Sequence, residues 1–452
     1  MGLCALTAAL FFLPFYLIDG GFFHYAGDFN SQQISFYRYM NGFIKGAGYP
    51  DSAFTSVHNT FSWATDLGSG VMNAYSFYLY GSPFFWFSLL FPQNWLPYLM
   101  VPLLVLKFAV AGGGAYLYLR RYVKNIDYAV LGAVLYAFSG FTVYNVFFNH
   151  FVDVVALFPY LLWSLDEALY NDRRSWFAFW VAVNLVNNYF FFIGQVVFLA
   201  IYFICKLSAG DFRLTAKKFG LLAFESVLGV AMGSILLVPA VLSILQNPRT
   251  IDLSSGWGFL TYSKVQQYLA ILVSWIMPPD SPYLTSIWSE GVIKWTSMSA
   301  YLPLCSLAGA AAYWQAKHGD SKKRIVGTCA VFALVPILNS AFYALNSSYY
   351  ARWYYMPVLV LAAMTVNALE DHNTDLDSPA RGISWLMIAT VAFAVVPVKD
   401  GDTGSWSLGV LKNPGQYCAV LGFGLLGLLV YRALCQKWRA DRRFAQRMTA
   451  AV

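Results

Sequence analysis

The sequence has few charged residues. Asp, Glu, Lys and Arg make up only 11% of its 452 residues, whereas 59% are hydrophobic and 19% are aromatic. Soluble domains average about 25% charged residues, and the mean hydropathy here is +0.54. This composition excludes an ordinary soluble fold. Because apolar segments recur along the whole length with no polar half, we expect one membrane domain over residues 1–452.

Several catalytic and metal-binding motifs are missing from the sequence. It contains no Walker loop, no GxSxG elbow, no HExxH and no paired CxxC, which argues against nucleotide hydrolysis, serine-triad hydrolysis and a structural zinc site. The six cysteines lie in or beside apolar segments with no neighbouring His, so they are expected to pack inertly. No cofactor is expected. The cysteines are Cys4, Cys205, Cys305, Cys329, Cys418 and Cys435.

The formal net charge of +7 does not indicate a nucleic-acid partner. No cluster of Lys and Arg falls in an RNA- or DNA-binding pattern. Cytoplasmic loops of membrane proteins collect Lys and Arg, so these residues report orientation instead.

Apolar runs near the length of a membrane-spanning helix, about 20 residues, recur along the chain. They predict an all-α, polytopic membrane protein with about twelve transmembrane helices. The expected spans lie near residues 2–18, 95–119, 127–147, 154–171, 175–188, 189–206, 220–245, 298–316, 325–346, 352–369, 382–398 and 415–434. The pair at 175–206 carries Asn184, Asn187, Asn188 and Gln195, which we expect to face other helices or a cavity.

Most of the 29 Lys and Arg residues fall between spans on one side, which predicts cytoplasmic N- and C-termini. The protein is therefore expected in a plasma membrane, with an uncleaved first helix and a basic cytoplasmic tail at 435–452. Two long segments, 19–82 and 246–297, fall outside, and long loops are usually functional. The short segment 82–91 is expected to lie in the membrane interface.

The first outer loop, residues 19–82, concentrates polar side chains among aromatic ones. Asp28 and Gln32 are four residues apart, so a helix over QQISFYRYMNGFIKG would place both near its start on one face. Asp28 could instead only cap that helix. Asp66, in TDLGSG, is expected to shape a turn with its glycines.

Other outward-facing segments carry further candidates. In NVFFNHFVDVVALFP, His150 and Asp153 are either functional groups facing the first loop or part of a solvated interfacial turn. In NSSYYARWYYMP, Arg352 offers a planar donor fork suited to phosphate, or it is a snorkelling Arg among aromatic residues. Arg38 and Lys294 are weaker candidates for substrate binding.

Four stretches in this order resemble the YfhO family of bacterial membrane proteins, which has the GT-C fold of polytopic glycosyltransferases. They are GDFNSQQISFYRY, FSWATDLGSGVMNAYSFYLYGSPFFWFSLLFP, FSGFTVYNVFFNHFVDVVALFPYLLWSLDEAL and SSYYARWYYMP. The match spans most of the chain. Family members are often longer, with an outward C-terminal region, so the resemblance leaves acceptor specificity open.

The resemblance implies transfer of a sugar, with inversion, from a polyprenyl-phosphate-linked donor to a cell-surface acceptor such as teichoic acid or another envelope polymer. Asp28 matches the general base of such enzymes and Asp153 a second functional acid. Arg352 would neutralise the donor phosphate, with His150 assisting, and Gln32, Arg38 and Lys294 would contact substrate. No metal is expected, although some diphosphate-using relatives take a divalent ion. A flippase or transporter of lipid-linked saccharides, or a noncatalytic partner in a surface-polymer assembly, is the alternative.

Overall fold

The computed structural model confirms a mostly helical protein, with 73% helix and 2% strand. It describes residues 1–46, 61–66, 68–245, 258–262, 265–283, 287–288, 295–347, 349–399 and 406–452.

The chain divides into two compact units. The first comprises Met1–Gly114, Asn145–Val196 and Phe212–Asp252, and the second comprises Ala115–Tyr144, Val197–Asp211 and Leu253–Val452. Helices α5 (Leu96–Leu119) and α10 (Tyr189–Ala209) begin in the first unit and end in the second.

The remaining elements of the first unit are α1 (Gly2–Ile18), η1 (Phe29–Ile34), α2 (Ser35–Lys45), β1 (Phe61–Ser62), β2 (Ser69–Gly70), α3 (Val71–Tyr75), η2 (Ser76–Tyr80), α4 (Pro83–Ser88), η3 (Gln93–Trp95), η4 (Asn145–Phe148), α8 (His150–Tyr170), α9 (Trp176–Asn187) and α11 (Ala216–Ile244). Those of the second unit are α6 (Ile126–Ala137), α7 (Gly140–Tyr144), α12 (Val265–Ile276), η5 (Pro303–Cys305), α13 (Leu307–Ala316), α14 (Ser321–Leu334), α15 (Pro336–Ala341), α16 (Tyr355–Glu370), α17 (Asp377–Ala389), η6 (Thr390–Ala394), β3 (Pro397–Lys399), β4 (Trp406–Leu408), α18 (Pro414–Trp438) and α19 (Phe444–Ala451).

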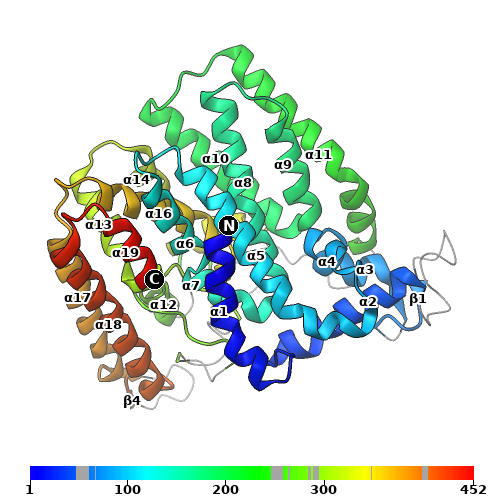
Figure 1. Cartoon of the computed structure of the whole chain (residues 1–452), viewed down its shortest axis with the longest axis horizontal. Coiled ribbons are helices and arrows are strands. Elements are labelled where there is room, and N and C mark those ends of the chain that lie inside the picture. Colours follow the sequence, from blue (N-terminus) through cyan, green and yellow to red (C-terminus); the bar gives the residue numbers. More distant parts are fainter. Residues whose placement is uncertain are drawn as a thin grey trace. The chain divides into compact units, whose positions relative to one another are not determined.

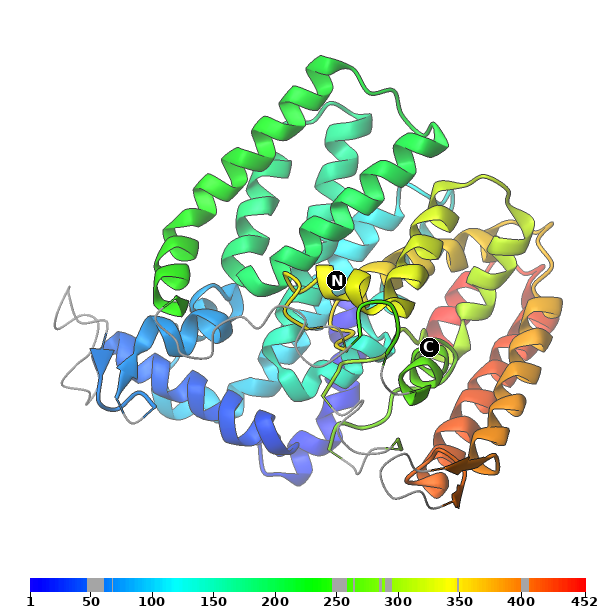
Figure 2. The ribbon, with the colours of Figure 1, turned by 180° about the vertical axis from the view of Figure 1, so that it is seen from behind.

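In the first unit, α11 lies along α9 (Figure 1, and from behind in Figure 2). Two glycines one turn apart allow this close approach. A Cβ atom on Gly229 would lie 2.6 Å from the carbonyl oxygen of Ala178, and one on Gly233 would lie 2.5 Å from a methyl carbon of Leu185. Small residues at this spacing let helix backbones meet inside membranes.

The polar residues expected to be sheltered between α9 and α10 are indeed buried. Asn184, Asn187, Asn188 and Gln195 are all at most 5% exposed. Asn188 has extended dihedrals and separates the two helices. Its Nδ2 donates to the carbonyl of Phe77 at 2.9 Å, and its Oδ1 accepts from the backbone N–H of Phe191 at 3.2 Å. The break between the helices therefore also anchors η2.

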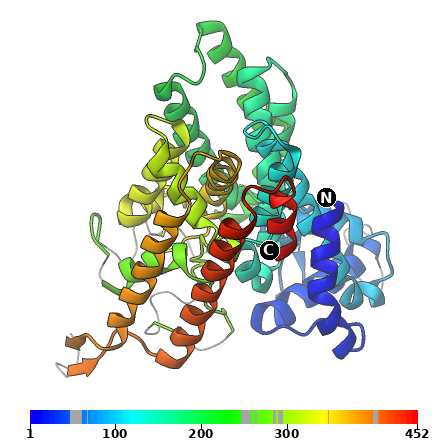
Figure 3. The ribbon, with the colours of Figure 1, turned by 60° about the vertical axis from the view of Figure 1, so that its left-hand side comes forward.

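In the second unit, α16 is the central helix. Most of its side chains are buried, and α6, α13 and α14 pack against it. Helices α17 and α18 run side by side, joined through the antiparallel strands β3 and β4 (Figure 3).

Five described helical segments are long and apolar enough to cross a membrane: Gln93–Leu119, Ile126–Phe148, Tyr189–Ala209, Ala216–Ile244 and Pro414–Trp438. In the most apolar part of Ala216–Ile244, only 22% of the residues are buried, as expected for a helix that faces lipid. Helices also occur at the other expected spans, but several are short. The multi-helix membrane architecture is supported, and a total of twelve crossings stays a prediction.

Two expected segments differ from the structure. The expected loop 246–297 contains the helix α12, whose apolar sequence is too short to cross a bilayer. The expected tail 435–452 is largely helical. Helix α18 continues to Trp438, and α19 packs against α6 by burying Phe444, Ala445 and Met448.

Candidate functional site

Asp28 lies in the segment between α1 and α5, next to an irregular helix. It immediately precedes the π-helical turn η1, which leads directly into α2. Within the described residues, its side chain makes no capping hydrogen bond to η1. Instead, Nε2 of Gln32 donates to Oδ1 of Asp28 at 3.3 Å, so the residues spaced four apart do meet. Asp28 is half-buried, and π-helical turns are frequent at functional sites.

Gln33, beside this pair, was not singled out from the sequence. It is 1% exposed, and within the described residues neither of its amide atoms has a hydrogen-bond partner. A buried amide without a partner is costly, at about 1–3 kcal/mol. Such a group is a candidate for binding a ligand. Its only sequence signal is its position after Gln32.

Asp153 belongs to a buried polar cluster. Oδ1 of Asp153 lies 2.6 Å from Nζ of Lys107, and the side chains are 2% and 0% exposed. The hydroxyl of Ser82 donates to Oδ2 of Asp153. Nζ of Lys107 also donates to the side-chain and backbone oxygens of Asn149, at 2.8 and 3.1 Å. Burial rules out the solvated turn considered for Asp153.

This cluster fastens the segment between α1 and α5 to the apolar helices α5 and α8. Lys107 comes from α5 and Asp153 from the first turn of α8, where a carboxylate also suits the helix dipole. Ser82 caps α4 by accepting from the N–H of Phe85 at 3.2 Å. Tyr37 of α2 is fully buried beside the cluster, and burial together with the charge of Asp153 raises its pKa well above the ordinary value. The cluster therefore ties α2 and α4 to α5 and α8.

His150 and Arg38 occupy different environments. His150 is 4% exposed and contacts three rings edge-on, those of Phe77, Tyr78 and Phe151, with centroids 4.5–5.1 Å away. Arg38 is exposed on α2. Asp66 shapes a turn as expected, since it has a φ of 46° between the paired strands β1 and β2.

Arg352 lies in the second unit, between two residues that hydrogen bonds hold in place. The N–H of Ala351 donates to the carbonyl of Thr296 at 2.8 Å, and Nε1 of Trp353 donates to Oδ1 of Asn339 at 2.6 Å. Cζ of Arg352 lies 4.0 Å from the centroid of the Tyr350 ring. Arg352 is itself only partly buried. Its guanidinium is thus accessible while the neighbouring backbone is fixed, and this combination suits the binding of an anion.

The predicted residues thus fall into two groups. Asp28, Gln32, Arg38, His150 and Asp153 belong to the first unit, and Arg352 belongs to the second. Lys294 lies outside the described residues. In the described part of the chain, no three His, Cys, Asp or Glu side chains are grouped to hold a metal ion. The first unit contains the Asp28 and Asp153 carboxylates, and the second contains the Arg352 guanidinium.

Comparison with known proteins gives one family. No curated protein and no solved structure gives a significant match. The family model described as "Bacterial membrane protein YfhO" matches residues 3–438, nearly the whole chain. The chain therefore belongs to the YfhO family of bacterial membrane proteins.

Proposed function

We propose that the protein is a membrane glycosyltransferase that moves a sugar from a polyprenyl-phosphate-linked donor to a hydroxyl of a cell-surface polymer, such as teichoic acid. The observation that carries the proposal is the Asp28 carboxylate, which is half-buried at a π-helical turn and accepts a hydrogen bond from a neutral amide. This carboxylate suits a general base better than the buried Asp153, which is in an ion pair with Lys107.

In the proposed reaction, a carboxylate oxygen of Asp28 takes the proton of the acceptor hydroxyl as that oxygen attacks the anomeric carbon. The bond from the anomeric carbon to the donor phosphate oxygen breaks, with inversion, and the polyprenyl phosphate leaves as an anion. Arg352 stabilises the leaving phosphate electrostatically. Gln32 orients Asp28, and Asp153 acts as a positioning residue through Lys107 and Ser82.

The direct test is sugar transfer by the purified, full-length protein in liposomes, using radiolabelled polyprenyl-phosphate hexoses and teichoic acid. Asp28→Asn should abolish transfer while keeping donor binding, because the amide keeps the shape but accepts no proton. Asp19→Asn is the matched control. Asp19 lies in the same segment, where its carboxylate accepts from the N–H of His24 at 2.8 Å and lies 3.3 Å from Nδ1 of the same residue.

Retained transfer by Asp28→Asn would overturn the assignment of the base. If the wild-type protein transfers no sugar but moves labelled lipid-linked saccharide between leaflets, the transporter alternative replaces the enzyme. Polymers from a deletion strain, analysed by mass spectrometry, should lack one sugar.

A further inference from the structure

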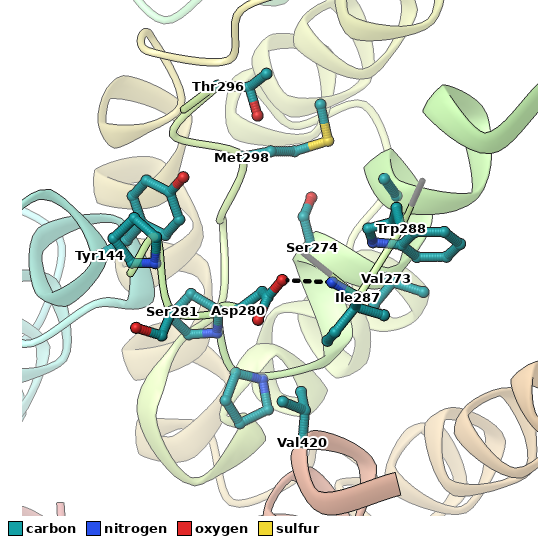
Figure 4. Close-up of a pocket in the computed structure, with 14 residues that line it drawn as sticks. Tyr144, Val273, Ser274, Asp280, Ser281, Ile287, Trp288, Thr296, Met298 and Val420 are labelled. Atoms are coloured by element: carbon teal, nitrogen blue, oxygen red, sulfur yellow. Dashed lines mark hydrogen bonds between the residues drawn. The ribbon is translucent and has the colours of Figure 1, made fainter. Parts of the chain in front are cut away.

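A pocket in the second unit brings together polar and apolar side chains that no sequence motif indicates. Its walls come from α7, from α12 and the segment after it, and from α18, and they enclose about 590 Å³ when the open mouth is included. Figure 4 shows Tyr144, Ser274 and Thr296 around the space beside the carboxylate of Asp280.

Among the described lining residues, Asp280 carries the charge. Its Oδ2 accepts from the N–H of Ile287 at 2.9 Å, and its Oδ1 accepts from Nε2 of Gln416. The backbone N–H of Ser281 donates to the same carboxylate. A carboxylate has roughly four acceptor positions, so these three bonds fix its orientation and leave capacity for a ligand. Burial raises the pKa of Asp280 to about 6 in spite of these bonds. Near neutral pH it can thus accept hydrogen bonds and, when protonated, donate one.

The pocket lies next to the phosphate-binding candidate. Tyr144, which lines it, interacts electrostatically with both Asp280 and Arg352. Thr296, also in the lining, accepts the backbone hydrogen bond of Ala351, the residue before Arg352. Tyr144 and Thr296 therefore connect the carboxyl group of Asp280 with the segment that carries Arg352.

The lining matches a sugar ring. A hexose presents hydroxyl groups at its rim and C–H groups on its faces, so it needs polar partners at the edge and apolar surfaces above or below. Asp280, Tyr144 and Thr296 supply the polar partners, while Pro278, Pro279 and Val420 supply apolar surface. This composition, mostly apolar with a few convergent polar groups, is typical of small-molecule sites.

We propose that this pocket binds the sugar of a glycosyl phosphate lipid, with Asp280 reading its hydroxyl groups and Arg352 taking the adjacent phosphate. The identity of the lipid-linked sugar as substrate rests on the proposed function. The pocket itself is an additional specificity site, since Asp280 selects the sugar without taking part in proton transfer.

A labelling experiment tests the pocket without relying on catalysis. Ser281→Cys places a thiol in the lining, and Cys418→Ser removes the one exposed native cysteine. The rate of maleimide labelling of full-length protein in liposomes is measured with short-chain polyprenyl phosphates that carry glucose, galactose or N-acetylglucosamine. The same phosphate without a sugar is the comparison. A bound sugar probe at about ten times its Kd should slow labelling about tenfold.

Adding Asp280→Asn should weaken protection by the best sugar probe about tenfold, because a hydrogen bond to a charged group is lost, and leave binding of the bare phosphate unchanged. Asp375→Asn, at an exposed carboxylate of the same unit, should change neither. Equal protection by the bare phosphate and the sugar probes would overturn the proposal, because the pocket would then read only the phosphate.

The two proposals fail in different ways. Sugar transfer by the wild-type protein with no protection of the thiol by any sugar probe overturns the pocket and leaves the enzyme standing. Protection by one sugar probe without transfer supports the pocket and overturns the glycosyltransferase.

Discussion

The Nζ atom of Lys107 and the Oδ1 atom of Asp153 lie 2.6 Å apart, in side chains that are 0% and 2% exposed. Each of these two buried charges is stabilised by the other, because little water is present to solvate it. If one charge is removed, the remaining charge is buried without a partner. The pair holds α5 to α8, and through Ser82 it also holds the start of α4.

Breaking this pair should be far more costly than replacing it. Lys107→Met or Asp153→Asn alone leaves an unpaired buried group, so each should lower the free energy of unfolding by about 3–5 kcal/mol. The double variant Lys107→Met, Asp153→Leu should be much closer to wild type than the sum of the single changes. Thermal unfolding in detergent measures all of these variants.

The same double variant separates positioning from catalysis. Assayed well below its Tm, it should keep sugar transfer if Asp153 acts only through the ion pair. A folded double variant with no transfer would assign Asp153 a direct part in the reaction. Additive single effects on Tm would contradict the coupling itself.

Gln33→Leu should change stability and function in opposite directions, by stabilising the ligand-free protein while weakening its activity. The side chain is buried and its amide atoms lack partners among the described residues, so an apolar replacement of similar size should raise the free energy of unfolding by about 1 kcal/mol. If the amide contacts substrate, KM for the acceptor rises at the same time. A lower Tm for Gln33→Leu would show that the amide is already satisfied in the folded protein.

Arg352→Ala should impair use of the donor more than use of the acceptor. Loss of one positioned charge at a developing anion costs about a hundredfold or more in rate, so kcat/KM for the donor should fall by about that factor. Arg352→Lys should recover part of the loss, because Lys restores charge but not the planar fork. Arg381→Ala, an exposed cation on α17, is the control. Equal losses for both substrates would contradict a phosphate-specific role.

Asp280 should make the free energy of unfolding depend on pH in the mildly acidic range. Its pKa rises from 3.8 to about 6 on folding because of burial, so the folded state holds the proton more tightly than the unfolded state. The resulting stabilisation is fully present below pH 3.8 and is lost as the pH rises through about 6. The difference between the two pKa values corresponds to at most about 3 kcal/mol.

The measurement is Tm in detergent between pH 4 and pH 8, compared for the wild type and Asp280→Asn. The wild type should lose stability relative to the variant as the pH rises to about 6, and the difference should then be constant. A difference that does not change with pH would show that Asp280 has an ordinary pKa.

Parts of the fold that depend on local pattern were predictable from the sequence. Runs of apolar residues located α1, α5, α9 and α10 to within a few residues, and the four-residue spacing predicted that Gln32 meets Asp28. Helix α12 was missed because its short sequence, VQQYLAILVSWI, lies between segments rich in polar residues and proline, where a loop was the simpler expectation.

The rest depends on contacts between distant residues. Lys107 falls within the expected span 95–119, but its pairing with Asp153 could not be predicted, because Asp153 comes from another helix and no spacing rule connects the two residues. The pocket was missed for the same reason, since Tyr144, Asp280 and Val420 lie far apart along the chain. Gln33 looked like its neighbour Gln32 until burial distinguished them.

The pairing of Lys107 with Asp153 also bears on how the protein is made. Synthesis delivers α5, with Lys107 in it, before Asp153 of α8 exists. A lone lysine near the centre of a helix opposes insertion by roughly 3 kcal/mol, so the apolar remainder of α5 must carry that helix into the bilayer, or its insertion must wait for α8. The segment between α1 and α5, which carries Asp28, contributes Ser82 to the same cluster. The segment proposed to hold the catalytic base is therefore synthesised well before Asp153, which its Ser82 contacts in the folded protein.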